Sequence, residues 1–188
     1  RSLDRVYALT FNMLAWSRSN SIEIELVAFE PIVQDAVELV QGACDRNSVS
    51  LQVSIDSDMP PIPIDATAML QVLLNVLNNA IEASPENAGA VAIDVSMNQH
   101  REHVLISVVD NGCGIESENK EVVFRAFHTT KGQRGTGLGL AVARKIVLEH
   151  GGSIELIQRP EGGTRCAISL PLDRDDDPSD TRGPAVIM

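Results

Sequence analysis

The glycine pattern between residues 110 and 140 is the feature that most constrains the fold of this chain. An alternating apolar run over residues 104–109 predicts a buried strand, which ends in Asp-Asn-Gly-Cys-Gly-Ile at residues 110–115. About twenty residues later, a G-x-G-x-G run opens an apolar-periodic segment that predicts a helix. A helix N-terminus presents unbonded N–H groups and a positive dipole end, and glycine lets the backbone approach a ligand closely. The pattern therefore predicts a nucleotide site, with the residues between as a lid.

Two better-known phosphate motifs are excluded by the sequence. The run G-x-x-x-x-G-K-S/T of a P-loop does not occur. The dinucleotide fingerprint G-x-G-x-x-G requires glycine three residues after Gly137, where Leu140 stands. A G-x-G-x-G run alone is a weak signal, because glycine-rich turns also precede ordinary helices. A second element is therefore needed to support a nucleotide site.

That second element lies upstream, in an amphipathic segment. Apolar residues at 70, 73, 74, 77, 80 and 81 predict a helix, and Asp65 is a good N-cap after a turn at residues 60–63. Asn75 and Asn79 are four residues apart and share one face of this helix. Asparagine is a poor helix former, so the pair is either solvent-exposed or presents amide oxygens to a metal. Mg²⁺ prefers oxygen ligands and takes few from the protein when phosphates supply the rest.

Four segments of the sequence resemble the motifs of one protein family. Residues 75–80 resemble the N box, residues 110–115 the G1 box, residues 124–131 the F box and residues 135–140 the G2 box of two-component sensor histidine kinases of the nitrogen-regulation type. These kinases belong to the wider superfamily of gyrase, heat-shock-chaperone and mismatch-repair ATPases. The resemblance covers roughly residues 20–172. It implies a Bergerat-type α/β two-layer sandwich, in which a mixed sheet is covered on one face by three helices.

The same resemblance implies a site for ATP and Mg²⁺. Asp110 would accept the adenine amino hydrogen, and Asn79 would bind Mg²⁺. Asn75 on the phosphate side and Lys131 at the β- and γ-phosphates are the expected catalytic residues. The other expected nucleotide contacts are Gly112, Gly114, Ile115, Thr130, Gly135, Thr136, Gly137, Leu138, Gly139, Leu140 and Thr164. A solvated lid lysine at 131 and an ordinary strand threonine at 164 remain open alternatives.

Two F-box positions depart from the family pattern. Ala126 replaces the usual proline, and His128 stands where an aromatic residue is common. Both changes concern how the lid docks and leave the expected ATP contacts unchanged.

The residue four positions before the metal asparagine bears on the type of reaction. In the hydrolases of the superfamily this residue is a glutamate that acts as the base for water, whereas Asn75 cannot accept a proton at neutral pH. The difference favours an ATP-dependent protein-histidine kinase, whose phosphohistidine passes its group to a response-regulator aspartate. Three alternatives remain open: an anti-sigma type of serine kinase, a hydrolytic ATPase clamp, and a nucleotide-binding module without activity.

Two segments flank the expected catalytic domain. Residues 1–19 carry an apolar stripe that predicts a helix, which the resemblance assigns to the second helix of the dimerisation and phosphoacceptor hairpin. Residues 1–99 contain no histidine, so the usual acceptor is expected outside this sequence, in a homodimeric parent protein. Residues 173–188 are acidic at first and then contain proline and glycine, which predicts a disordered tail.

Composition narrows the partners and the compartment. A net charge of −11 argues against an electrostatic nucleic-acid surface. Three cysteines without a C-x-x-C spacing suggest neither zinc nor a disulfide framework. No signal peptide or membrane-length apolar run is visible, so we expect a cytoplasmic fragment whose parent protein can still be membrane-associated.

Periodicity also predicts the remaining elements. Alternation and apolar periodicity predict strands at 22–26, 48–56, 90–97, 103–110, 153–157 and 164–170, and further helices at 31–40 and 138–150. The last two strands are expected to pair as a hairpin across residues 159–163.

Overall fold

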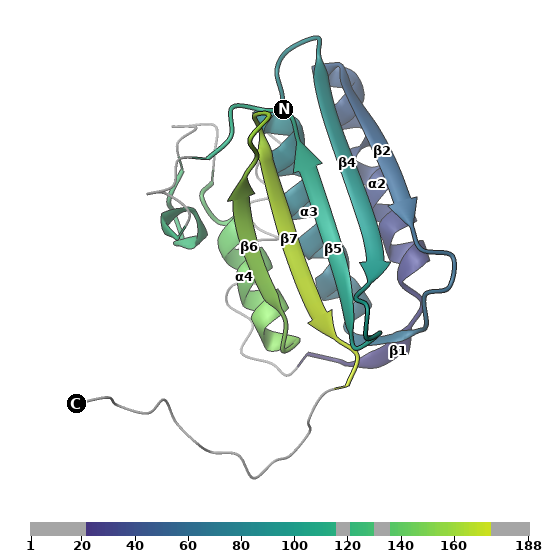
Figure 1. The fold of residues 1–188 in the computed structure, drawn as a ribbon. Coiled ribbons are helices and arrows are strands. Elements are labelled where there is room, and N and C mark those ends of the chain that lie inside the picture. The colour runs from purple at the N-terminus through teal and green to yellow at the C-terminus, as the bar shows by residue number, and fades with distance from the viewer. Residues whose placement is uncertain (1–21, 116–120, 130–135, 174–188) are drawn as a thin grey trace, which may run out of the picture.

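A five-stranded mixed sheet forms one layer of the fold in this computed structural model, which describes residues 22–115, 121–129 and 136–173. In spatial order its strands are β2 (Val49–Ile55), β4 (Gly89–Met97), β5 (His103–Asp110), β7 (Thr164–Pro171) and β6 (Ser153–Gln158). The pair β2 and β4 is parallel and the other neighbours are antiparallel (Figure 1). The hairpin expected from β6 and β7 is therefore confirmed.

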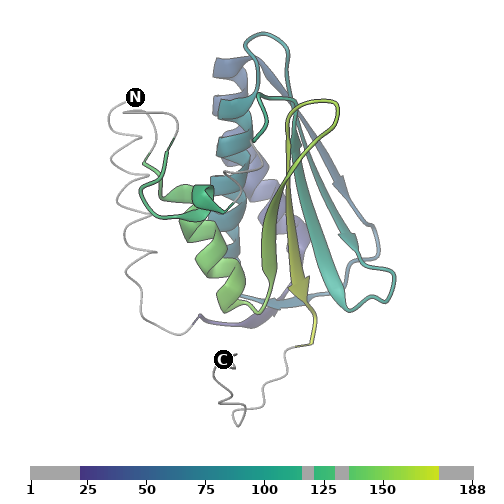
Figure 2. The same cartoon turned by 60° about the vertical axis from the view of Figure 1, so that its left-hand side comes forward.

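Three helices of the described chain form the second layer. They are α2 (Phe29–Asn47), α3 (Ala66–Ala83) and α4 (Gly139–Glu149), and they cover one face of the sheet (Figure 2). A short 3-10 helix, η2 (Val122–Phe124), packs beside α4, where the Arg144 guanidinium lies 5.0 Å from the centre of the Phe124 ring. The predicted two-layer sandwich, with a mixed sheet covered on one face by three helices, is confirmed.

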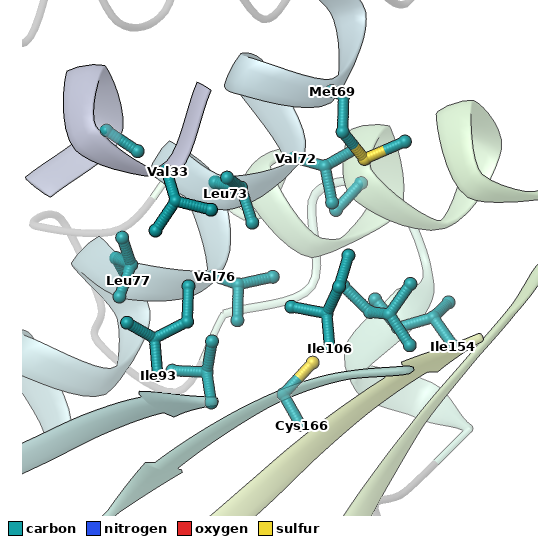
Figure 3. Packing of buried hydrophobic residues seen from close by; sticks show 14 of the residues in the cluster. Val33, Met69, Val72, Leu73, Val76, Leu77, Ile93, Ile106, Ile154 and Cys166 are labelled. Atoms are coloured by element: carbon teal, nitrogen blue, oxygen red, sulfur yellow. The ribbon is translucent and has the colours of Figure 1, made fainter. Parts of the chain in front are cut away.

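The core lies between the two layers, and it follows from the residue periodicities. In β5 the residues at alternate positions are buried, so one face of the strand points at the helices. Leu73, Val76 and Leu77 of α3 are each at most 2% exposed and face Ile93 and Ile106 of the sheet (Figure 3). The helix α3 is the central one of the three, because it packs against both α2 and α4.

Two predicted elements near the N-terminus are corrected by the structure. The strand expected at 22–26 is β1 (Glu25–Val27), and the expected turn at 60–63 runs into a strand, β3 (Ile62–Ile64). These two pair antiparallel in a separate two-stranded sheet, with Leu26 opposite Pro63. Proline signals a turn in a sequence because it lacks an N–H, yet a two-stranded ribbon tolerates it at an edge position. The helix expected at 31–40 is also longer, because α2 begins at Phe29 and ends at Asn47.

A buried histidine joins the end of α4 to the beginning of α3. His150 is 2% exposed, and its Nε2 accepts a hydrogen bond from the Asp65 N–H at 3.0 Å. Its Nδ1 lies 2.8 Å from the carbonyl oxygen of Ile146, so the neutral ring with hydrogen on Nδ1 satisfies both contacts. Asp65 also caps α3 as expected, since its Oδ1 accepts from the Ala68 N–H at 2.9 Å.

We expect His150→Ala to lower the free energy of unfolding by about 2–4 kcal/mol, because it removes buried volume and a hydrogen-bond acceptor. The matched control is His100→Ala, since His100 is exposed in a turn between two strands and should change stability by less than about 0.5 kcal/mol. Urea denaturation followed by circular dichroism measures both values. Equal stabilities of the two variants would contradict a structural role for His150.

Several expectations fall on residues that the structure does not describe. The helix expected within residues 1–19 and residues 174–188 of the expected tail are among them. Within the described ranges, every helix is too short or too polar to cross a lipid bilayer.

Candidate functional site

The carboxylate of Asp110 lies at the end of β5 and is largely buried, with 5% of the residue exposed. Its Oδ1 accepts two backbone hydrogen bonds, from the Gly112 N–H at 2.8 Å and from the Thr164 N–H at 3.1 Å. No described residue donates a hydrogen bond to the other carboxylate oxygen, Oδ2. One oxygen is thus fixed by the protein, and the second can accept a hydrogen bond from a ligand amino group.

Thr164 contacts the Asp110 carboxylate through its backbone N–H, and its role as a nucleotide contact stays a prediction. A strand residue offers this N–H whatever its side chain, which is why the residue type alone gives little signal. Cys166 on β7 is a buried neighbour of Asp110, and burial together with the Asp110 charge raises the pKa of its thiol to about 12. Cys166 is therefore a protonated core residue at neutral pH.

The segment 110–115, which we call the G1 turn, packs against the C-terminal end of α3. A Cβ atom on Gly112 would overlap the carbonyl group of Ala83, the last residue of α3. Asn111 holds the turn to the adjacent strand region, since its Nδ2 donates to the Ala88 carbonyl and its Oδ1 accepts from the Ala90 N–H, each at 2.8 Å. Glycine at 112 is required here by space.

The N-terminus of α4 lies beside Asn75 of α3, about two helical turns before Ala83. A Cβ atom on Gly139, the first residue of α4, would lie 3.3 Å from Oδ1 of Asn75. Nδ2 of Asn75 is buried and has no hydrogen-bond partner among the described residues. A buried amide donor without a partner is rare because it loses its hydration without compensation. Its position beside a helix N-terminus suits an anionic acceptor such as a phosphate oxygen.

The helix α3 therefore connects two ends of one site. Asn75 touches Gly139 at one end, and Ala83 touches Gly112 at the other. Eight residues of α-helix span about 12 Å, which is comparable to the reach from a purine to the phosphates of a nucleotide. Asn79 lies midway, one turn from each end and on the same face. This spacing brings the predicted base, metal and phosphate residues to one side of α3.

A third contact joins the F-box segment to the G2 segment. The Phe127 N–H donates to the Gly137 carbonyl at 2.9 Å, and both residues have a φ of 65°. A Cβ atom on Gly137 would lie 2.5 Å from the backbone of Phe127, so glycine is needed at this crossing. His128 follows, with a buried Nδ1 that has no partner among the described residues.

Some expected residues fall outside the description, and others were not expected. Thr130, Lys131 and Gly135 lie outside the described residues, so their roles stay predictions. Gln158 and Arg159, which no motif singled out, both contact the G1 turn. The sequence pattern predicts only a hairpin in this region, and nothing in a hairpin pattern shows which loop the hairpin will contact.

Comparisons with known proteins agree with this geometry. The family model described as "Histidine kinase-, DNA gyrase B-, and HSP90-like ATPase" matches residues 64–174. The sensory histidine kinase/phosphatase NtrB of Azospirillum brasilense is 34% identical over an alignment of 197 residues, gaps included, and the match covers 96% of this chain and 48% of that protein. The chain thus spans about half the length of this relative.

Solved structures show the same fold. The catalytic domain of histidine kinase ThkA is 31% identical with a TM-score of 0.72, over 80% of this chain and 97% of that one. Full-length ShkA in complex with AMPPNP is 26% identical with a TM-score of 0.78, over 90% of this chain and 36% of that one. ThkA in complex with the response regulator protein TrrA gives a TM-score of 0.75 at 28% identity, over 92% of this chain and 48% of that one. The Bergerat-type fold expected from the sequence is confirmed by these structures.

Proposed function

Because this chain belongs to the histidine kinase-, DNA gyrase B-, and HSP90-like ATPase family, we propose that it is the ATP-binding catalytic domain of a sensor histidine kinase. The observation that carries the proposal is that two polar atoms, Oδ2 of Asp110 at the end of β5 and Nδ2 of Asn75 on α3, have no hydrogen-bond partner among the described residues. Oδ2 of Asp110 suits the adenine amino group, and the buried Nδ2 of Asn75 suits a phosphate oxygen. ShkA, a relative in fold, binds the ATP analogue AMPPNP.

Asn79 is the residue that would hold Mg²⁺ between these two ends. An amide oxygen is a ligand type that Mg²⁺ accepts, and the ion takes its remaining ligands from phosphates and water. In the described part of the chain, no group of three or more His, Cys, Asp or Glu side chains could form a metal cage. When bound, the ion would neutralise charge on the phosphates, while Asn79 fixes where that charge is neutralised.

The reaction that fits these residues is phosphoryl transfer to a histidine. Such transfers depend on positioning and charge stabilisation more than on covalent chemistry by the protein. Asn75 orients the phosphate end but cannot deprotonate water, so ATP is preserved until an acceptor arrives. Lys131 would neutralise the β- and γ-phosphates when the lid closes. The acceptor would be a histidine of the dimerisation hairpin, and the phosphoryl group would then pass to a response-regulator aspartate.

The proposed organisation has residues 20–172 as the catalytic domain and residues 1–19 as the second hairpin helix. A single amphipathic helix cannot bury its apolar stripe alone, so this helix would pair with others in a homodimeric four-helix bundle. Of the proteins that resemble this chain, NtrB is a sensory histidine kinase/phosphatase and ThkA is a histidine kinase that forms a complex with the response regulator protein TrrA.

The direct test combines this chain, Mg·ATP and a separately produced acceptor hairpin carrying the family's histidine. We expect the hairpin to acquire acid-labile, base-stable phosphate, with little free phosphate released in its absence. The control is the same hairpin with its histidine replaced by glutamine, which should stay unlabelled. Rapid phosphate release without the hairpin would favour a hydrolytic clamp, and ATP binding with neither product would favour an inactive module.

A further inference from the structure

The turn between β6 and β7 holds the beginning of the G1 turn. Nη1 of Arg159 donates to the backbone carbonyl of Asp110 at 3.0 Å, and the Thr164 N–H donates to Oδ1 of Asp110 at 3.1 Å. Gly163 lies against the same carbonyl, because a Cβ atom at that position would overlap it. Main chain and side chain of the base-recognition residue are thus both fixed from one hairpin.

The same hairpin holds the other end of the G1 turn. The Ile115 N–H donates to Oε1 of Gln158, the last residue of β6. The amide group of Gln158 also lies directly over Gly114, in the space that a Cβ atom would occupy. Gly114 has a φ of +78°, so this end of the turn adopts a conformation that depends on glycine and is covered by one side chain.

Arg159 is itself fixed in place. Its backbone N–H donates to the Gly163 carbonyl at 3.1 Å, and Nη2 of its guanidinium lies 3.6 Å from the carboxylate of Glu161. Its side chain is 31% exposed, so the contact with the Asp110 carbonyl is partly protected from water. A charged donor bound to a backbone carbonyl makes a stronger hydrogen bond than a neutral one.

We propose that Gln158 and Arg159 are positioning residues for recognition of the nucleotide base. They act through the G1 turn, by holding Asp110 so that its second carboxylate oxygen faces the base before the nucleotide arrives. A turn fixed in advance does not have to be ordered on binding, and this raises affinity for the base. The inference rests on the proposed function, because it assigns a role within the ATP site.

The readout that separates positioning from mere stability is the preference for ATP over ITP, measured by equilibrium titration with the two nucleotides. ITP carries a keto oxygen where ATP carries the amino group, so the preference reports the orientation of Asp110. For both Arg159→Ala and Gln158→Ala we expect roughly 5–20-fold weaker ATP binding and a preference for ATP that falls toward one. Arg159→Lys should restore part of the preference, since lysine also donates to a carbonyl.

Matched controls come from the same hairpin. Arg165→Ala removes an exposed arginine whose Nε donates to the hydroxyl oxygen of Ser107 on β5 at 2.9 Å, and it should keep the ATP-to-ITP ratio of the unaltered chain. Gly163 and Gly162 both have positive φ, but only a Cβ atom on Gly163 would overlap the Asp110 carbonyl, since a Cβ atom on Gly162 would have no atom within 4 Å. Gly163→Ala should therefore lower the ATP-to-ITP ratio, whereas Gly162→Ala should not. Circular dichroism confirms that each variant is folded.

Suppose that the unaltered chain prefers ATP and that both Arg159→Ala and Gln158→Ala keep its ATP-to-ITP ratio. This result would overturn the positioning role and leave the proposed function intact. An unaltered chain that binds neither nucleotide would instead overturn the proposed function.

Discussion

Asp110→Asn is expected to weaken ATP binding roughly 100-fold, because it changes one atom at the centre of the base site. The asparagine carbonyl can still accept the two N–H groups of Gly112 and Thr164, so the turn should keep its shape. The amide NH₂ group then replaces Oδ2 and meets the adenine amino group donor to donor. Titration of the folded variant with a fluorescent ATP analogue, or calorimetry, measures the loss.

The nucleotide dependence makes this prediction specific. An amide donor can pair with the keto oxygen of ITP, so we expect Asp110→Asn to lose its preference for ATP and to favour ITP. The matched control is Asp94→Asn, which changes an exposed aspartate in β4 and should bind ATP like the unaltered chain. Undiminished ATP affinity in Asp110→Asn would place the base elsewhere.

Asn79→Ala is expected to abolish the part of ATP affinity that depends on Mg²⁺. The substitution removes the only expected protein ligand of the ion, and alanine is a better helix former, so α3 should remain intact. Binding of ATP by the unaltered chain should be tighter with Mg²⁺ than with EDTA. Binding by Asn79→Ala should be weak in both conditions, which titrations in the two buffers would measure.

The adjacent asparagine supplies the control for this experiment. Asn78 points away from the site region on the exposed side of α3, where its Nδ2 donates to the Leu74 carbonyl at 2.8 Å. Asn78→Ala should retain the full response to Mg²⁺. If Asn79→Ala also retained it, the proposed metal ligand would be wrong.

The sequence was sufficient for the fold class and for most of the elements. Period-two and helical patterns identified each strand of the main sheet and the three covering helices, because one face of each element must be buried in a two-layer fold. Residue types also marked the candidate site, since the positive φ at Gly137 and the carboxylate of Asp110 are properties of single residues. Such properties are visible in one segment of sequence, whereas the contact with Ala83 that requires glycine at 112 is not.

Contacts between distant segments were decided only by the tertiary structure. The pairing of β1 with β3 brings together residues that no local pattern links. Pro63 predicts a turn where β3 in fact forms. The bond from the Thr164 N–H to Asp110 uses a backbone group that every residue except proline carries, so its sequence position held no signal. The contacts of Gln158 and His150 likewise depend on which partner the packed chain brings near them. A residue whose role is set by a partner far away in sequence can be identified only once the layers are assembled.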